Sequence, residues 1–398
     1  MNYLTIIIGL ILFELIIQFF IKKIKKKFQW FLEKKDEVPK FNATKFKNYI
    51  KKSFNKNLGW IRKPNTVGYD TLGTKKIKFK INKNGYRQNI KVNKKPLIVS
   101  FGGSYVFCRQ VQDKDTWQEQ ISRDKKFNIL NYGVGNYGTD QALLYYKSKK
   151  FKTDTKIAIM GIVPEHISRI QSEWKHYSEF GNIHAFKPKF YLKNNKLILK
   201  KNALNSNTKI KEIQKIIKKL KKTDRFYSDK FKKNIFSFPY SFQFLKNLNF
   251  NIKIFYIYFF FKNNLTKRKD LFLKAVMTRN IIEAHNFYKE EYSRNLFFSI
   301  LKEFKTTALK NKQIPVVVVF PMLLDIKNYK TNIHYQNFFK EAISEELPVL
   351  DLTKNFENKN LNKFFTNEIY GNHLTPHGNK YVSKIIYNFL KRNCNEFI

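Results

Sequence analysis

The sequence PLIVSFGGSYVFC, residues 96–108, joins a short apolar run to two glycines and a serine. The length and β-branched content of Leu97–Phe101 are typical of a buried strand, and Gly102 and Gly103 allow a sharp turn before Ser104. Ser104 is therefore expected at the carboxyl end of a strand, where open α/β sheets bind ligands. That position suits a nucleophilic serine, and it also suits a turn serine that caps the following helix.

Strand and helix patterns alternate from this segment to the end of the chain. Each expected strand is a short apolar run, and segments with helical spacing of apolar residues lie between the strands. Five such strands imply an α/β domain with a mostly parallel five-stranded sheet that is covered on both faces. The other expected strands are Phe127–Val134, Ile157–Val163, Gln313–Phe320 and Leu347–Leu352, and the expected helices cover 116–121, 139–149, 294–311 and 375–391.

A small β region precedes this domain. Lys76–Ile81 alternates charged and apolar residues, which predicts a half-exposed strand in a hairpin. The polar, lysine-rich residues 34–58 predict a linker or a loosely packed lead-in. We divide the chain into an anchor with a basic flank (1–33), a linker with the β region (34–94) and the α/β domain (95–398).

The interval between the third and fourth strands is much longer than a usual connection in an α/β domain. We therefore expect an insertion at about residues 170–293. It contains the extended-looking Lys187–Leu192 and a basic helix near Ile210–Lys222. Its most apolar piece, Ile252–Phe261, is too short to span a membrane, which leaves a buried helix, an interfacial segment or a lid.

The N-terminus predicts a single membrane-spanning helix. Tyr3–Ile21 is close to the roughly 20 apolar residues that cross a bilayer, and no cleavage site of a signal peptide follows it. Glu14 and Gln18 share one helix face, so Glu14 is either protonated or in contact with a membrane partner. The lysines at 22–27 favour a cytoplasmic soluble part by the positive-inside rule.

Composition adds little to the assignment of function. The 77 Lys and Arg against 30 Asp and Glu give a formal charge of +47, which invites binding to nucleic acid or anionic lipid. The lysines are scattered, however, and Asn, Phe, Ile and Tyr are enriched with them, as AT-rich codons would produce. We therefore expect no nucleic-acid partner. The two cysteines, Cys108 and Cys394, form neither a disulfide framework nor a metal motif, and no cofactor or metal is expected.

A serine nucleophile needs a base and donors for the oxyanion. His373 lies in a loop between the fifth strand and the last helix, at the same sheet edge as Ser104. Asn136 and His166 follow the second and third strands and converge on that edge. The alternatives are that His373 caps the last helix or belongs to the core, and that His166 bonds neighbouring backbone. Arg169 and Trp174 either line a substrate groove or close a domain surface.

The chain resembles the SGNH (GDSL-like) hydrolase superfamily, especially its membrane-anchored members with a Gly-Trp and an Asn-x-x-Gly-x-Arg segment before the sheet. The resemblance covers about residues 59–392 and implies a flavodoxin-like three-layer α/β/α fold. The matching segments are FGGS (101–104) with VQDKDTW (111–117), NYGVGNYGTDQ (131–141), GIVPEHISR (161–169) and NHLTPHGN (372–379).

The resemblance implies that Ser104 is the nucleophile and His373 the base. The aspartate that precedes the serine in the family is Gly103 here, while Asn136 takes the place of the oxyanion glycine and His166 that of the oxyanion asparagine. The oxyanion would then be held by Ser104, Asn136 and His166.

The acid that normally precedes the histidine is replaced by Tyr370 or Gly371. His373 is therefore expected to be oriented by a backbone carbonyl or by a more distant carboxylate such as Glu368 or Asp351.

The implied function is hydrolysis or transfer of an acyl ester, such as an O-acetyl group on a cell-surface or exported glycan. The first alternative is a catalytically impaired glycan-binding or assembly protein of the same fold. The second is an anionic-lipid-binding surface protein, which charge alone suggests. The resemblance favours the outer side of the membrane and the basic flank favours the inner side, so the side stays open.

Overall fold

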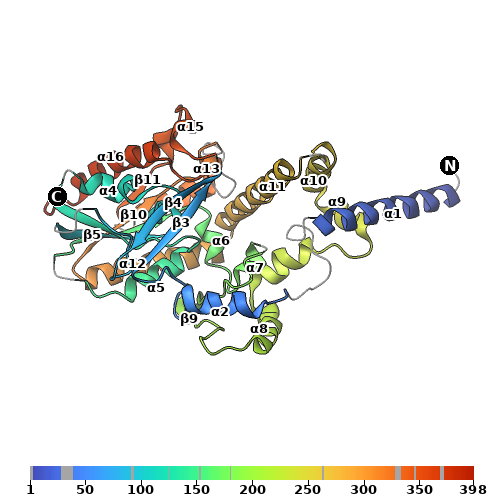
Figure 1. Cartoon of the computed structure of the whole chain (residues 1–398), viewed down its shortest axis with the longest axis horizontal. Coiled ribbons are helices and arrows are strands. Elements are labelled where there is room, and N and C mark those ends of the chain that lie inside the picture. The colour runs from blue at the N-terminus through green and yellow to red at the C-terminus, as the bar shows by residue number, and fades with distance from the viewer. Residues whose placement is uncertain are drawn as a thin grey trace.

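The computed structural model of the chain describes residues 3–27, 39–90, 94–123, 125–151, 154–179, 181–261, 264–327, 333–344, 347–367 and 372–398. Figure 1 shows an α/β body that contains the C-terminus, and an N-terminal helix that projects from the opposite end. Helices of the insertion lie between the two.

The body is built on one parallel sheet of five strands, as predicted. Its order is β11-β10-β7-β5-β6, so the first strand of the sheet, β5, lies between the second and the third. This is the flavodoxin-like doubly wound order, in which the chain changes direction between β5 and β7 and leaves a crevice at their carboxyl ends. The strands are β5 (Lys95–Gly102), β6 (Phe127–Asn131), β7 (Ile157–Ile162), β10 (Ile314–Val319) and β11 (Val349–Asp351).

Helices cover both faces of the sheet. Successive residues of a strand point to opposite faces, so Val99 and Val317 belong to one hydrophobic core while Ile98 and Val318 belong to another. The body therefore has three layers. One helical layer consists of α5 (Thr139–Lys147), α12 (Glu291–Lys310) and α14 (Ile333–Ser344), and the other consists of α4 (Trp117–Ser122) and α16 (Pro376–Asn393).

The region before the sheet is more ordered than the sequence predicted. The predicted hairpin is present, but the expected linker contains helix α2, whose Phe46 is buried in the core. Phe46, Tyr49 and Ile50 lie on one helix face, and the surrounding lysines conceal this pattern. The elements are α2 (Ala43–Lys52), β1 (Phe54–Asn55), β2 (Gly59–Trp60), β3 (Thr66–Leu72) and β4 (Lys75–Ile81).

Arg87 ties this region to the turn that follows β5. Its buried guanidinium donates to the carbonyl oxygens of Phe107 at 2.7 Å and Cys108 at 2.8 Å, and also to that of Val111. It forms an ion pair with Asp113 at 2.7 Å. Because a planar guanidinium bonds several acceptors in fixed directions, Arg87 holds the segment around Ser104 in one conformation.

The insertion is mostly helical, and the apolar piece at 252–261 belongs to a helix, α10. The N-terminal helix, α1 (Tyr3–Lys27), is long and apolar enough to cross a membrane. The insertion contains α7 (Lys175–Ser178), β8 (Lys189–Lys193), β9 (Lys196–Lys200), α8 (Ile210–Thr223), α9 (Tyr240–Lys246), α10 (Leu248–Phe260) and α11 (Leu265–Asn286). Four short helices complete the α/β body: α3 (Ser104–Phe107), α6 (His166–Arg169), α13 (Leu323–Lys327) and α15 (Leu361–Phe364).

Candidate active site

Ser104 is the first residue of α3, immediately beyond the carboxyl end of β5. Two glycines allow α3 to lie directly on the sheet. Gly102 and Gly161 are paired across β5 and β7, and a Cβ atom on either would clash with the side chain of Val106 in α3. The absence of side chains at these two positions therefore places the Ser104 hydroxyl close to the crevice between the strands.

The structure brings His373 to Ser104 across 269 positions of sequence. His373 Nε2 lies 2.8 Å from Ser104 Oγ, which is hydrogen-bond distance. The histidine is buried, and its carbonyl accepts a 2.7 Å hydrogen bond from the amide of Thr366. Tyr105 packs against the imidazole with the ring centres 5.1 Å apart, and its hydroxyl donates to the Asn372 carbonyl. These contacts fix the loop that carries the ring.

Of the two carboxylates considered for orienting His373, Asp351 belongs to the described residues and Glu368 lies outside them. Tyr370 and Gly371, which replace the family's acid, also lie outside them. The Asp351 carboxylate accepts hydrogen bonds from Thr353 at 2.6 and 2.9 Å and from the Tyr335 hydroxyl at 3.0 Å. None of these three hydrogen bonds comes from His373. The role of Asp351 in orienting His373 therefore stays a prediction.

Asn136 follows β6 in a loop held by the region before the sheet. Its φ of 67° lies in the left-handed region, which asparagine tolerates better than most residues. The indole nitrogen of Trp60 donates to the Gly135 carbonyl at 3.1 Å, and the Tyr137 hydroxyl donates to the Trp60 carbonyl. The Gly-Trp segment thus supports the loop whose Asn136 lines the same cavity as Ser104.

His166 is buried at the end of β7, beside Gly103. Its Nδ1 lies 3.1 Å from the Thr139 hydroxyl, and its Nε2 has no hydrogen-bond partner among the described residues. Burial, together with the charge of Arg169, holds the pKa of His166 well below its usual range, so the ring is neutral at physiological pH. If Thr139 donates to Nδ1, then Nε2 carries the proton and can act as a donor.

Gly103 and His166 depend on each other sterically. A Cβ atom at Gly103 would lie 2.9 Å from His166 Nε2, so a side chain there would displace the ring. We expect Gly103→Asp to lower the free energy of unfolding by about 1–3 kcal/mol, as other overpacking substitutions do. His166→Asn in the same chain is expected to recover part of this loss, measured by urea denaturation. Strictly additive effects of the two substitutions would contradict the steric explanation.

A cavity of about 490 Å³ opens onto Ser104 and His373. It collects residues that follow all five strands of the sheet, and helix α11 of the insertion forms an apolar wall. Charged groups lie on the remaining sides, including an ion pair of 2.6 Å between Arg169 and Glu165. The lining residues are Ser104, Arg109, Asn136, Glu165, Arg169, Glu179, Gly181, Asn182, Leu273, Val276, Met277, Met322 and His373.

No known family model and no curated protein matches this chain. A function for the site must therefore be inferred from its own residues. Their arrangement is a hydroxyl and an imidazole at hydrogen-bond distance, and both line a cavity that is part apolar and part charged.

Some lining residues were predicted and others were missed. Arg169 lines the cavity, in line with the alternative that it belongs to a substrate groove. Trp174 is not among the lining residues; it is buried and stacks on Phe186 with the ring centres 4.9 Å apart. Glu165 could have been found, because it precedes Arg169 by four residues and the two form an ion pair. The wall residues of α11 carry no sequence signal that links them to a site.

His176 supports the loop at the cavity rim. Its Nδ1 accepts a 3.1 Å hydrogen bond from the amide of Gly181, and burial lowers its pKa to about 3. In the unfolded chain the pKa of His176 is about 6.5. As the pH falls, His176 is therefore protonated in the unfolded chain before it is protonated in the folded one. The stability that the neutral ring contributes is complete above about pH 6.5 and decreases as the pH falls toward 3.

We expect acid to destabilise the wild type more than His176→Asn, whose side-chain oxygen keeps the acceptor but does not titrate. Between about pH 7.5 and about pH 5, the wild type should lose about 2 kcal/mol more of its free energy of unfolding than the variant. Urea denaturation at the two pH values measures this difference. Equal losses would show that the ring binds a proton as readily in the folded chain as in the unfolded one.

Proposed function

We propose that this chain is a membrane-anchored SGNH-like hydrolase or O-acyltransferase that acts on acyl esters, with acylated glycans of the cell surface as the favoured substrate class. The observation that carries the proposal is the 2.8 Å contact between Ser104 Oγ and His373 Nε2 beside a ligand-sized cavity. The proposed anchor is α1, which has the length and apolarity of a membrane span.

In the proposed reaction His373 Nε2 takes the proton of Ser104 as Oγ attacks the acyl carbonyl carbon. The resulting oxyanion would be held by the amides of Ser104 and Asn136 and by His166 Nε2–H. Ser104 is the first residue of α3, so its amide has no acceptor within that helix. His373 then donates its proton to the leaving alcohol, and an acyl group remains on Ser104.

The second half of the reaction determines whether the protein hydrolyses or transfers. Water or an acceptor hydroxyl attacks the acyl carbon, His373 takes its proton, and that proton returns to Ser104 Oγ. The neutral state of His166 fits the role of an oxyanion donor, since its proton stays on the ring throughout. The apolar wall of α11 suits the acyl group, and the charged and amide side chains opposite suit sugar hydroxyls.

The rival function is glycan binding without catalysis. The departures at Gly103 and His166 support it, because each alters a position that the family uses near the serine. A fluorophosphonate probe separates the two functions in the full-length protein in detergent. Covalent labelling of Ser104, together with turnover of a p-nitrophenyl acetate-type ester, supports the enzyme. Saccharide binding with neither labelling nor turnover supports the rival.

A further inference from the structure

Helix α1 does not stand alone beside the α/β body. Ile17, Ile21 and Ile24 in its C-terminal half are buried in a cluster with residues of the insertion, whereas most of its other apolar side chains are exposed. In Figure 1 this half of α1 lies next to α9 and α10. The other buried members of this cluster are Phe236, Tyr240, Phe244, Ile254, Ile257, Tyr258, Phe272 and Ala275.

Glu14 is bonded to the beginning of α9. Its carboxylate accepts hydrogen bonds from the amide of Tyr240, at 2.5 Å, and from the amide of Ser241, at 2.8 Å. The first amides of a helix have no acceptor within the helix, and a carboxylate in a bilayer is costly unless it has a partner. The two hydrogen bonds between Glu14 and α9 therefore give the carboxylate donors and the first amides of α9 an acceptor, as both would need in the water-free interior of a bilayer.

The position of Glu14 along α1 sets the depth of this contact. Glu14 precedes Lys22, the first basic residue of the flank, by eight residues. Eight residues of α-helix rise about 12 Å. Half of the hydrocarbon core of a bilayer is about 15 Å thick. If α1 spans the membrane with Lys22 at its surface, the first residues of α9 lie within the hydrocarbon of one leaflet.

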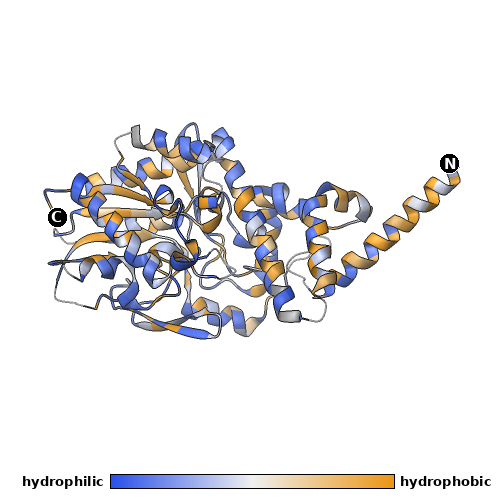
Figure 2. Ribbon diagram, turned by 90° about the horizontal axis from the view of Figure 1, so that it is seen from above, coloured by the Kyte–Doolittle hydropathy of each residue, from blue (hydrophilic) through white to orange (hydrophobic). Residues whose placement is uncertain are grey.

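The exposed surface of α9 and α10 is rich in large apolar side chains, as a surface in contact with lipid hydrocarbon requires. Phe242 of α9 is 61% exposed, and Phe238, two residues before α9, is 76% exposed; both values are unusual for large aromatic side chains in water. Figure 2 shows apolar residues continuing from α1 onto the helices beside it. Further exposed apolar residues of these two helices are Leu245, Leu248, Ile252, Tyr256, Phe259 and Phe260.

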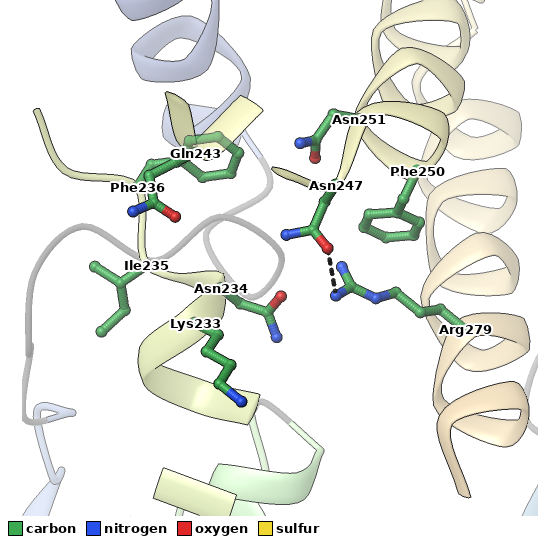
Figure 3. A pocket seen from close by; sticks show the side chains of 9 residues that line it. All are labelled: Lys233, Asn234, Ile235, Phe236, Gln243, Asn247, Phe250, Asn251 and Arg279. Atoms are coloured by element: carbon green, nitrogen blue, oxygen red, sulfur yellow. Dashed lines mark hydrogen bonds between the residues drawn. The ribbon is translucent and has the colours of Figure 1, made fainter. Parts of the chain in front are cut away.

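Three amide side chains of the same helices, those of Gln243, Asn247 and Asn251, line a small pocket instead, whereas that of Asn249 is exposed. Figure 3 shows these amide side chains in the pocket together with Arg279 of α11. Arg279 Nη2 donates to the side-chain oxygen of Asn247 at 3.3 Å, and the Asn251 amide donates to the Phe244 carbonyl at 2.8 Å. The lysines Lys246 and Lys253 are exposed, and their long side chains can reach the headgroups.

From these observations we infer that α9 and α10 form a re-entrant element embedded in one leaflet, bonded to α1 through Glu14, on the side of the bilayer that holds the α/β body. This inference rests on the membrane anchor of the proposed function but not on the chemistry of Ser104. The occupant of the exposed apolar surface is lipid, since that surface is continuous with the lipid-facing surface of α1.

The test measures quenching of a bimane label by doxyl groups on lipid acyl chains in the full-length protein. The vesicles contain phosphatidylcholine and phosphatidylglycerol. Both native cysteines are buried, and burial raises the pKa of Cys108 to about 12 and that of Cys394 to about 11, so neither competes for the label. Labels are placed at Phe242→Cys, at Leu10→Cys in α1, and at Val67→Cys, an exposed site on β3.

We expect the label at 242 to lose fluorescence to the same extent as the label at 10, and the label at 67 to keep its fluorescence. Quenching at 10 but not at 242 would overturn the re-entrant element and leave the anchor intact. A lack of quenching at 10 would overturn the anchor and the inference together. Ester turnover by the same samples reports on Ser104 independently of both outcomes.

A pair of substitutions tests the role of Glu14. Glu14→Gln keeps an oxygen that accepts a hydrogen bond from α9, whereas Glu14→Leu removes both acceptors. We expect the leucine variant to lose quenching at position 242 and keep it at position 10, and the glutamine variant to keep most of both. Unchanged quenching at 242 in the leucine variant would overturn docking through Glu14.

Discussion

Replacement of Ser104 by alanine is expected to reduce ester turnover by at least about 10³-fold, since loss of the nucleophile in a serine hydrolase costs up to about 10⁶-fold. The physical reason is that the Ser104 oxygen is the only atom of the protein proposed to bond the acyl carbon. The measurement is kcat/KM for a short p-nitrophenyl ester, with purified full-length protein in detergent. Circular dichroism and thermal unfolding establish that the variant is folded.

His373→Gln provides the matched test of the base. It is expected to cause a loss similar to that of Ser104→Ala, and the double variant should be no worse than either single variant, because the two residues act as one unit. Ser206→Ala, an exposed serine in a loop of the insertion, is the control and should leave turnover unchanged. Wild-type activity in Ser104→Ala would exclude this serine from the reaction.

Replacement of Lys187 by methionine is expected to cost about 3–5 kcal/mol of the free energy of unfolding, the usual cost of breaking a buried ion pair. The Lys187 ammonium group pairs with the Asp140 carboxylate, and their side chains are 3% and 0% exposed. The substitution leaves the Asp140 carboxylate buried without its cation. Among the described residues, the hydrogen bond that remains to it comes from the Gln141 amide at 2.8 Å. Urea denaturation measures the loss.

Two further variants separate charge from packing. Asp140→Asn combined with Lys187→Met removes both charges and is expected to recover much of the stability. Lys147→Met breaks the ion pair with Glu303, whose side chains are 42% and 36% exposed, and should cost less than about 1 kcal/mol. Similar losses in Lys187→Met and Lys147→Met would show that burial does not determine the strength of the pair.

The sheet could be predicted because each of its strands has a recognisable pattern of neighbouring residues. Runs such as Ile314–Val319 are apolar, short and rich in β-branched residues, and these properties depend only on neighbouring positions. Once five parallel strands are assumed, their carboxyl ends must share one edge of the sheet. The proximity of Ser104 and His373 follows from that rule without knowledge of the strand order.

The cavity wall and the environment of the histidines could not be predicted in the same way. Leu273, Val276 and Met277 look like an ordinary apolar helix face, and only the tertiary structure turns them toward Ser104. The contact between Gly103 and His166 joins two positions 63 residues apart, and no short-range pattern encodes it. The partner of Glu14 is 226 residues away, so the sequence indicated that a partner was needed but not which one.

Helix α11 contributes residues both to the cluster around α1 and to the cavity at Ser104. Phe272 belongs to the hydrophobic cluster that includes Ile17, Ile21 and Ile24 of α1, and its neighbour Leu273 lines the cavity at Ser104. If a ligand displaced Leu273, it would also shift Phe272 in that cluster, and ligand binding would then be coupled to the packing of α1. By reciprocity, a change that loosens α1 would alter ligand affinity in the cavity by the same factor. If α1 spans the bilayer as proposed, bilayer thickness would then influence binding at Ser104.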